Sequence, residues 1–163
     1  MRILGFDPGT RIAGYGVVDV SGNRISVAGF GVIDVRKETE FSKRLLGIHH
    51  GIKEIVGEFN PDTCAIEMAY VRKNVQSALR IGEGRGCAIL AMAMQGLTVA
   101  QYAPSVVKKS VTGRGLASKH QVQGMIRTLL NIREENLSED ASDALAVAVC
   151  HCHRVNRPRI PPG

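Results

Sequence analysis

The sequence predicts an α/β fold, with a five-stranded sheet of mixed direction flanked by helices, and three observations support this prediction. Strand-like apolar segments near the N-terminus are separated by short turn signals. Further along the chain, segments with helical apolar spacing alternate with short strand-like segments. Proline and glycine mark most of the boundaries. A chain of 163 residues can bury a hydrophobic core without disulfides, so one domain is expected.

The first three strands are expected at about Ile3–Phe6, Tyr15–Val20 and Arg24–Val35. The first strand stops sharply at Pro8-Gly9, and the second turns at Ser21-Gly22-Asn23. Short turns of this kind join neighbouring antiparallel strands. We therefore expect the N-terminal third to form an antiparallel meander.

The rest of the chain alternates between helices and short strands. The strand that contains Glu67 can lie beside the first strand, which would bring Glu67 and Asp7 to neighbouring strand ends. In the second helix, Gly82, Gly84 and Gly86 lower helix propensity, and we expect them to share one face that permits close backbone approach. The expected strands are Thr63–Met68 and Leu97–Ala103, and the expected helices are Glu40–Phe59, Val75–Met94, Pro104–Val111, Ser118–Leu130 and Ser138–Cys152.

Composition and charge narrow the class of protein. Residues 1–153 are expected to form a single domain, followed by a flexible, basic, proline-rich tail at 154–163. No apolar run reaches the roughly 18 residues of a membrane span, and the N-terminus lacks a signal-peptide pattern, so we expect a cytoplasmic protein. Lys and Arg number 21 against 15 Asp and Glu, and a net charge of +6 favours a polyanionic partner.

Four carboxylates stand out by their positions. Asp7 ends an apolar strand, and Glu67 lies within one, where a buried charge needs compensation. Asp140 and Asp143 are three residues apart near the start of the last helix and share one face. Singly, they have ordinary explanations as a turn residue, a first-turn helix acid or a partner of Arg or Lys. Together they have the chemistry of a Mg²⁺ site, and two such ions can assist phosphodiester hydrolysis.

The cluster Cys150-His151-Cys152-His153 does not have the spacing of a known zinc finger, and it ends a helical apolar run. We interpret the cysteines as small buried residues, because a reducing compartment keeps them free. The histidines are expected at helix-surface or hydrogen-bonded core positions rather than as ligands.

Four segments, taken in order, resemble RuvC-type Holliday-junction resolvases, which have a ribonuclease H-like fold. They are GFDPGTRIAGYGVV at 5–18, CAIEMAYVRKNVQSALRIGEGRG at 64–86, YAPSVVKKSVTGRGLASKHQVQGMIRTLL at 102–130 and DASDALAVAVCHCH at 140–153. The resemblance extends to about residue 153 and implies a crossover junction endodeoxyribonuclease that nicks two opposed strands symmetrically in DNA recombination and repair. Further implications are a homodimer joined through the helix at 75–94, and the RuvA–RuvB branch-migration complex as partner.

The resemblance also assigns the site residues. Asp7, Glu67, Asp140 and Asp143 are implied to be catalytic and to bind Mg²⁺, with two ions when DNA is bound and Mn²⁺ able to substitute. Lys119 is implied to act in catalysis by offsetting charge that develops on the scissile phosphate. The implied DNA-binding residues are Tyr70, Arg72, Lys73, Asn74, Lys108, Lys109, Arg114 and Lys119. Tyr70 matches an aromatic residue that stacks on unpaired bases, although it could also pack on its own loop, and the basic residues could form a solvated face.

Three other functions remain open at this point. A related ribonuclease H-like nuclease could act on an RNA–DNA hybrid or structured RNA. An actin-like nucleotide binder also opens with Asp-x-Gly-Thr, but such a fold needs a second domain. A junction-binding protein without catalysis is disfavoured, because all four acids are present.

Overall fold

The computed structural model describes residues 1–68, 75–133 and 137–155. Its five-stranded sheet has the order β3-β2-β1-β4-β5, in which the first three strands are antiparallel neighbours and β1, β4 and β5 run parallel. The predicted mixed sheet is therefore confirmed, including the pairing of the strand at Glu67 with the first strand. The strands are β1 (Arg2–Asp7), β2 (Ile12–Ser21), β3 (Arg24–Asp34), β4 (Thr63–Glu67) and β5 (Val99–Tyr102).

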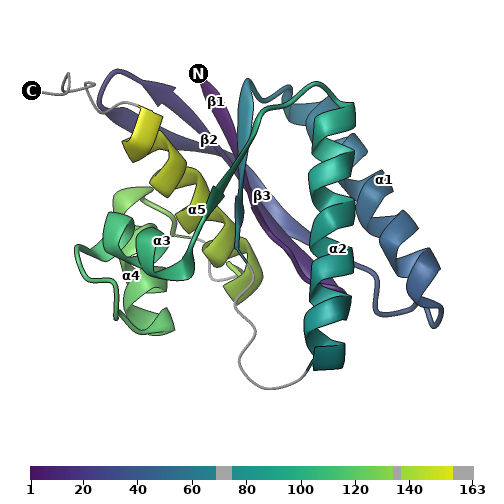
Figure 1. Cartoon of the computed structure of the whole chain (residues 1–163). Helices are drawn as coiled ribbons and strands as arrows, with labels where there is room; N and C mark the ends of the chain where they lie inside the picture. Colours follow the sequence, from purple (N-terminus) through teal and green to yellow (C-terminus); the bar gives the residue numbers. More distant parts are fainter. Residues whose placement is uncertain (69–74, 134–136, 156–163) are drawn as a thin grey trace, which may run out of the picture.

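Helices cover both faces of this sheet, with α1 and α2 on one face and α3, α4 and α5 on the other (Figure 1). They are α1 (Phe41–Phe59), α2 (Val75–Met94), α3 (Pro104–Thr112), α4 (Lys119–Leu129) and α5 (Glu139–Val155). The last helix runs past its expected end, so Arg154 and Val155 are helical rather than part of a tail. The rest of that expected tail, 156–163, lies outside the described residues. No described helix is both long enough and apolar enough to span a membrane.

Local sequence signals account for several helix ends. Helix α1 stops at Asn60, which adopts the left-handed conformation with φ of 46°, and Pro61 follows. Pro104 occupies the first turn of α3, where its missing N–H costs no hydrogen bond. Ser118 and Gln121 form a reciprocal capping box at the start of α4. This cap fixes the point at which Lys119 enters the helix.

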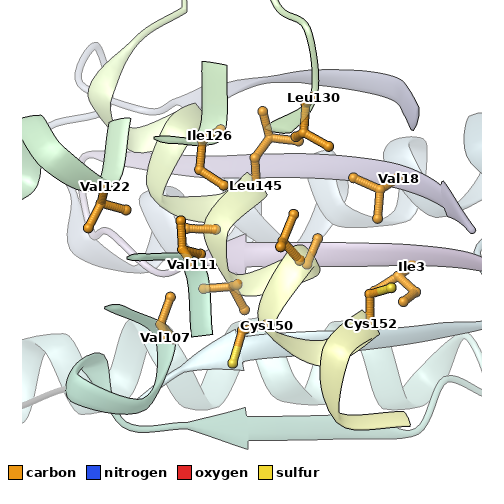
Figure 2. Packing of buried hydrophobic residues seen from close by; sticks show 14 of the residues in the cluster. Ile3, Val18, Val107, Val111, Val122, Ile126, Leu130, Leu145, Cys150 and Cys152 are labelled. Atoms are coloured by element: carbon orange, nitrogen blue, oxygen red, sulfur yellow. The ribbon is translucent and has the colours of Figure 1, made fainter. Parts of the chain in front are cut away.

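Each face of the sheet has its own hydrophobic core. On the α5 side, Ile3 and Val18 pack with Leu145, Cys150 and the apolar residues of α3 and α4 (Figure 2). On the other side, Leu4 and Phe6 pack against α1 and α2. Alternate residues of β1 thus contribute to opposite cores, as the pleat of a buried strand requires.

Helix α5 lies directly on the strands because they carry glycine beneath it. A Cβ at Gly5 would overlap the carbonyl of Ala144, and a Cβ at Gly14 would overlap the carbonyl of Asp140. Without these side chains the helix backbone can contact β1 and β2 closely. The glycines therefore set how near Asp140 and Asp143 come to the end of β1.

The prediction that three glycines of α2 share one face is wrong. Gly84 is buried, and a Cβ there would press on the side chain of Thr10. Gly82 and Gly86 are exposed, with nothing within 4 Å of a Cβ. Residues two positions apart on a helix point in different directions, since successive residues turn by about 100°. Gly84 serves packing within the chain, and the other two leave the outer face of α2 open.

Candidate active site

Asp7 and Glu67 lie at the same edge of the sheet. Asp7 is the last residue of β1 and Glu67 is the last residue of β4, and the two strands run parallel with Phe6 beside Ile66. Their carboxyl ends therefore meet at one edge, where α/β sheets commonly place ligands. Helix α5 contributes Asp140 and Asp143 from its N-terminal part.

Electrostatic coupling indicates that these acids face one another. The pKa of Asp7 is raised to about 7, chiefly by burial and then by the charges of Glu67, Asp143 and Asp140, whereas Lys119 opposes the rise. The pKa of Glu67 is likewise raised to about 7, chiefly by burial and then by the charge of Asp143, whereas Lys119 and Lys108 oppose the rise. Carboxylates that disfavour each other's ionisation in this way form a site with excess negative charge.

Asp143 is held next to a cation. Its Oδ2 lies 3.3 Å from Nζ of Lys119, the first residue of α4. Burial still raises the pKa of Asp143, although Lys119 acts in the opposite direction, and Asp143 in turn raises the pKa of Lys119. Lys119 thus lies at the acid cluster, where the sequence placed it.

Lys108 also lies near the site, because its charge acts to lower the pKa of Glu67. Lys109 lies elsewhere. It lines a cavity of about 880 Å³ together with Gly22, Ser110 and Arg154. Gly22 is in the turn at the opposite end of β2 from Gly14, which pairs with Asp7, so this cavity is at the far end of the sheet.

Arg114 is exposed in the loop between α3 and α4, where its N–H donates to the hydroxyl of Thr112. The remaining predicted DNA-binding residues, Tyr70, Arg72, Lys73 and Asn74, lie outside the described residues.

The donor set of the acid cluster fits a hard divalent cation. The ligands of such a cation would be carboxylate oxygens, which magnesium and manganese prefer to nitrogen or sulfur. In the described parts of the chain, no three His, Cys, Asp or Glu side chains converge into a ready-made ligand set. A bound cation would offset the mutual repulsion of these carboxylates.

The cysteine and histidine cluster of α5 has a structural role. Cys150 and Cys152 are buried in the α5 core. His151 is buried, and its ring nitrogens lie 2.7 Å from the hydroxyl of Tyr102 and 3.2 Å from that of Thr63. His153 contacts the hydroxyl of Ser110. The histidines therefore point to different partners.

Sequence reasoning missed Arg85. This residue of α2 donates from Nε to the main-chain carbonyl of Glu67 at 3.2 Å, and its guanidinium also contacts the side-chain oxygen of Gln101. The only sequence signal was an arginine placed between two glycines in a helix. That pattern says nothing about a strand end 18 residues earlier.

Comparison with known proteins gives one consistent result. The family model of the crossover junction endodeoxyribonuclease RuvC matches residues 3–151. A protein of that name from Geotalea uraniireducens is 49% identical over 153 residues, covering 94% of this chain and 89% of the relative. One from Nitrobacter hamburgensis is 46% identical over 153 residues, with the same coverage.

Solved structures agree with the sequence relatives. The structure of Thermus thermophilus RuvC in complex with a Holliday junction substrate has a TM-score of 0.88 and 29% identity, covering 95% of this chain and 94% of that one. The yeast mitochondrial Holliday junction resolvase matches with a TM-score of 0.66 at 13% identity, covering 91% of this chain and 76% of its own. The latter similarity concerns the fold alone.

Proposed function

This chain belongs to the RuvC family of crossover junction endodeoxyribonucleases, and from that premise we propose that it resolves Holliday junctions by paired, symmetric hydrolysis of phosphodiester bonds. The observation that carries the proposal is the position of Asp7 and Glu67 at adjacent strand ends of a ribonuclease H-like sheet, near enough to Asp143 and Lys119 for their charges to act on both acids. Four-way junction DNA would be its substrate, in DNA recombination and repair.

The residues of this site have separate roles in the proposed reaction. Asp7, Glu67, Asp140 and Asp143 would hold divalent cations, and we propose two Mg²⁺ ions per site with DNA bound, Mn²⁺ being able to substitute. When bound, such ions supply an activated water and stabilise the leaving oxygen. Lys119 would offset negative charge on the reacting phosphate. Lys108 would hold the neighbouring DNA backbone, because phosphate contacts position the substrate.

We further propose DNA contacts at Tyr70, Arg72, Lys73, Asn74 and Arg114. Lys109 would contact a region of the DNA remote from the cut, because it lies at the other end of the sheet. One nuclease domain would span residues 1–153 and continue to the end of α5 at Val155, with a basic tail after it. A role beside the RuvA–RuvB complex, and a cytoplasmic location with the DNA, rest on family membership.

A homodimer is proposed from the outer face of α2. Val75, Leu79, Leu90 and Met94 are all exposed, with relative accessibilities from 59% to 77%. They lie on the same side as Gly82 and Gly86, opposite the buried residues of the helix. A second copy seated there would cover this apolar strip in a two-fold, self-complementary interface, which matches the two opposed strands of a junction.

The decisive test compares cleavage of a synthetic four-way junction, a linear duplex and an RNA–DNA hybrid, with Mg²⁺ and with chelator. We expect metal-dependent cutting of the junction and little of the others. Asp7→Asn should abolish cutting while junction binding persists, because a ligand is lost and negative charge near phosphate is removed. Preferential cutting of the hybrid, or full activity of Asp7→Asn, would refute the proposal.

A further inference from the structure

The carbonyl of Glu67 receives no donor from its neighbour β1, although the register leaves the Glu67 N–H facing that strand. In β1, the N–H and carbonyl of Arg2 both face the β4 side, where they bond to Asp62. In β4, the N–H of Cys64 faces β5 and bonds to Thr98, and beyond the strand end the N–H of Met68 does the same with Tyr102. The main-chain N–H and carbonyl groups of successive residues in a strand point alternately to its two neighbouring strands. The carbonyl of Glu67 therefore points toward β1.

The neighbouring strand cannot supply a donor to that carbonyl. Gly5 is level with Ala65, so Glu67 is level with Asp7. In a parallel ladder, a carbonyl accepts from the residue after its partner, which here is Pro8. Proline has no N–H. The ladder between β1 and β4 thus stops at the catalytic edge, and the carbonyl of Glu67 needs another partner.

Arg85 of α2 is that partner. Its Nε donates to the Glu67 carbonyl, and its Nη2 donates to the side-chain oxygen of Gln101 on β5. The guanidinium holds these donors in a fixed plane, so it fixes both direction and distance. Helix α2 can lie close enough for this contact because Gly84, the preceding residue, packs against Thr10.

The second acceptor is itself well anchored. Gln101 precedes Tyr102, whose hydroxyl bonds to His151 on the other face of the sheet. The carbonyl of Tyr102 accepts the N–H of Met68. The end of β4 is therefore held by β5 at its edge and by α2 from one face, while the pKa of Glu67 responds to groups of α3, α4 and α5.

We propose that Arg85 is a positioning residue for Glu67, replacing the strand donor that Pro8 cannot give and setting where the Glu67 carboxylate lies relative to Asp7 and Asp143. This inference rests on the proposed function, because it takes Glu67 as a catalytic carboxylate. It also gives α2, whose outer face is the proposed dimer surface, a direct connection to the active site.

Two variants test this role. Arg85→Met removes all donors at similar size, and Arg85→Lys keeps the charge but cannot bridge both acceptors. In each we expect the single-turnover cleavage rate at saturating enzyme to fall on the order of 10- to 100-fold, because displacement of a catalytic group by about 1 Å has an effect of that size. Junction affinity in chelator should stay within about twofold of the original chain. Exchange of the Met68 amide should accelerate, while that of α5 amides should not change.

Arg80→Met is the matched control. Arg80 lies on the same helix, with its guanidinium over the ring of Phe41 and near Glu83, so its recorded partners in the described residues lie outside the acid cluster. We expect it to cut at the unaltered rate. If Arg85→Met fails to fold, Gln101→Met replaces it, since that change removes one acceptor only, and a smaller fall in rate is expected.

Three outcomes would overturn the inference. They are an unaltered cleavage rate in Arg85→Lys, an unaltered rate in whichever of Arg85→Met or Gln101→Met is used, and loss of junction affinity at constant cleavage rate, which would make Arg85 a DNA contact. Failure of the unaltered chain to cut junctions would instead overturn the proposed function, and this is measured before any variant.

Discussion

Helices α5 and α2 cover opposite faces of the same sheet (Figure 1), but α5 is buried from Ala141 to Cys152 except near Asp143, whereas α2 exposes one whole side. Glycine residues have different structural roles next to α5 and within α2. Glycines of β1 and β2 admit the backbone of α5. Gly82 and Gly86 of α2 lie open to solvent. The same residue type can thus fix one helix in a core and prepare another for a partner, and only the surroundings distinguish the two uses.

The largest difference should appear when one carboxylate is changed on each helix. Asp143→Asn on α5 should reduce junction cleavage by at least about 100-fold, the usual effect of losing one charge-stabilising group in an active site. Glu83→Gln on α2, where Glu83 only approaches Arg80 at 3.9 Å, should leave cleavage unchanged. Rates measured with Mg²⁺ at saturating enzyme check this. An equal loss of cleavage in both variants would contradict the assignment of the active-site carboxylate to α5 rather than α2.

The acids at this edge of the sheet, Asp7 above all, should also make metal-free stability depend on pH. The pKa of Asp7 is raised from 3.8 to about 7, so between these values the folded chain binds more protons than the unfolded chain. The free energy of unfolding should then fall as pH rises from about 4 to about 7, by up to a few kcal/mol.

Denaturant unfolding in chelator at several pH values measures this dependence. Asp7→Asn should flatten the curve and be more stable than the original chain near pH 7. If the free energy of unfolding of Asp7→Asn changed with pH as much as that of the original chain, the effect could not be assigned to Asp7.

A smaller effect is expected from filling the space under α5. Gly14→Ala should lower the free energy of unfolding by about 1–3 kcal/mol, because its Cβ would meet the backbone of Asp140. Gly57→Ala in α1 has open space around it and should instead raise stability by about 0.5–1 kcal/mol. Thermal and chemical unfolding of both variants would show the opposite signs. If Gly14→Ala raised the free energy of unfolding, the backbone of α5 could not lie in close contact with β2 at Gly14.

A moderate change in self-association is predicted for the outer face of α2. Leu79→Glu places a charge on the exposed apolar strip and should weaken self-association by about tenfold or more, about 1.4 kcal/mol. Its secondary structure should be unchanged, since Leu79 is 63% exposed. Sedimentation equilibrium provides the measurement, with Leu116→Glu as control because that leucine is fully exposed on another surface. An identical dimer constant would exclude α2 as the interface.

Much of this architecture could be predicted from the sequence because the signals are local. Apolar periodicity predicted α1 to within one residue of its observed bounds, and Pro8 and Gly22 marked the ends of β1 and β2. The parallel pairing of β1 with β4 followed from the order of elements. Lys119 was placed beside the acids from its match to the family, and the structure puts it 3.3 Å from Asp143.

What sequence reasoning could not give were contacts between distant segments. Nothing near Gly14 shows that the carbonyl of Asp140 will lie against it. Similarly, Arg85 gives no sign that it serves Glu67, because the need arises from Pro8 on a third element. The far position of Lys109 depends on which side of α3 faces α5. Such facts depend on tertiary packing, which local patterns do not record.

The acids of this site lie at positions 7, 67, 140 and 143, so the whole segment between the first and the last of them must be synthesised before they can come together. Until α5 docks, β1 and β2 lack the cover of one face, and Asp143 and Lys119 cannot pair. A nascent or truncated polypeptide that ends before residue 140 therefore lacks two of the four acids proposed as metal ligands. A nuclease site built from these four acids would therefore stay incomplete during synthesis until α5 has been made and has docked on the sheet.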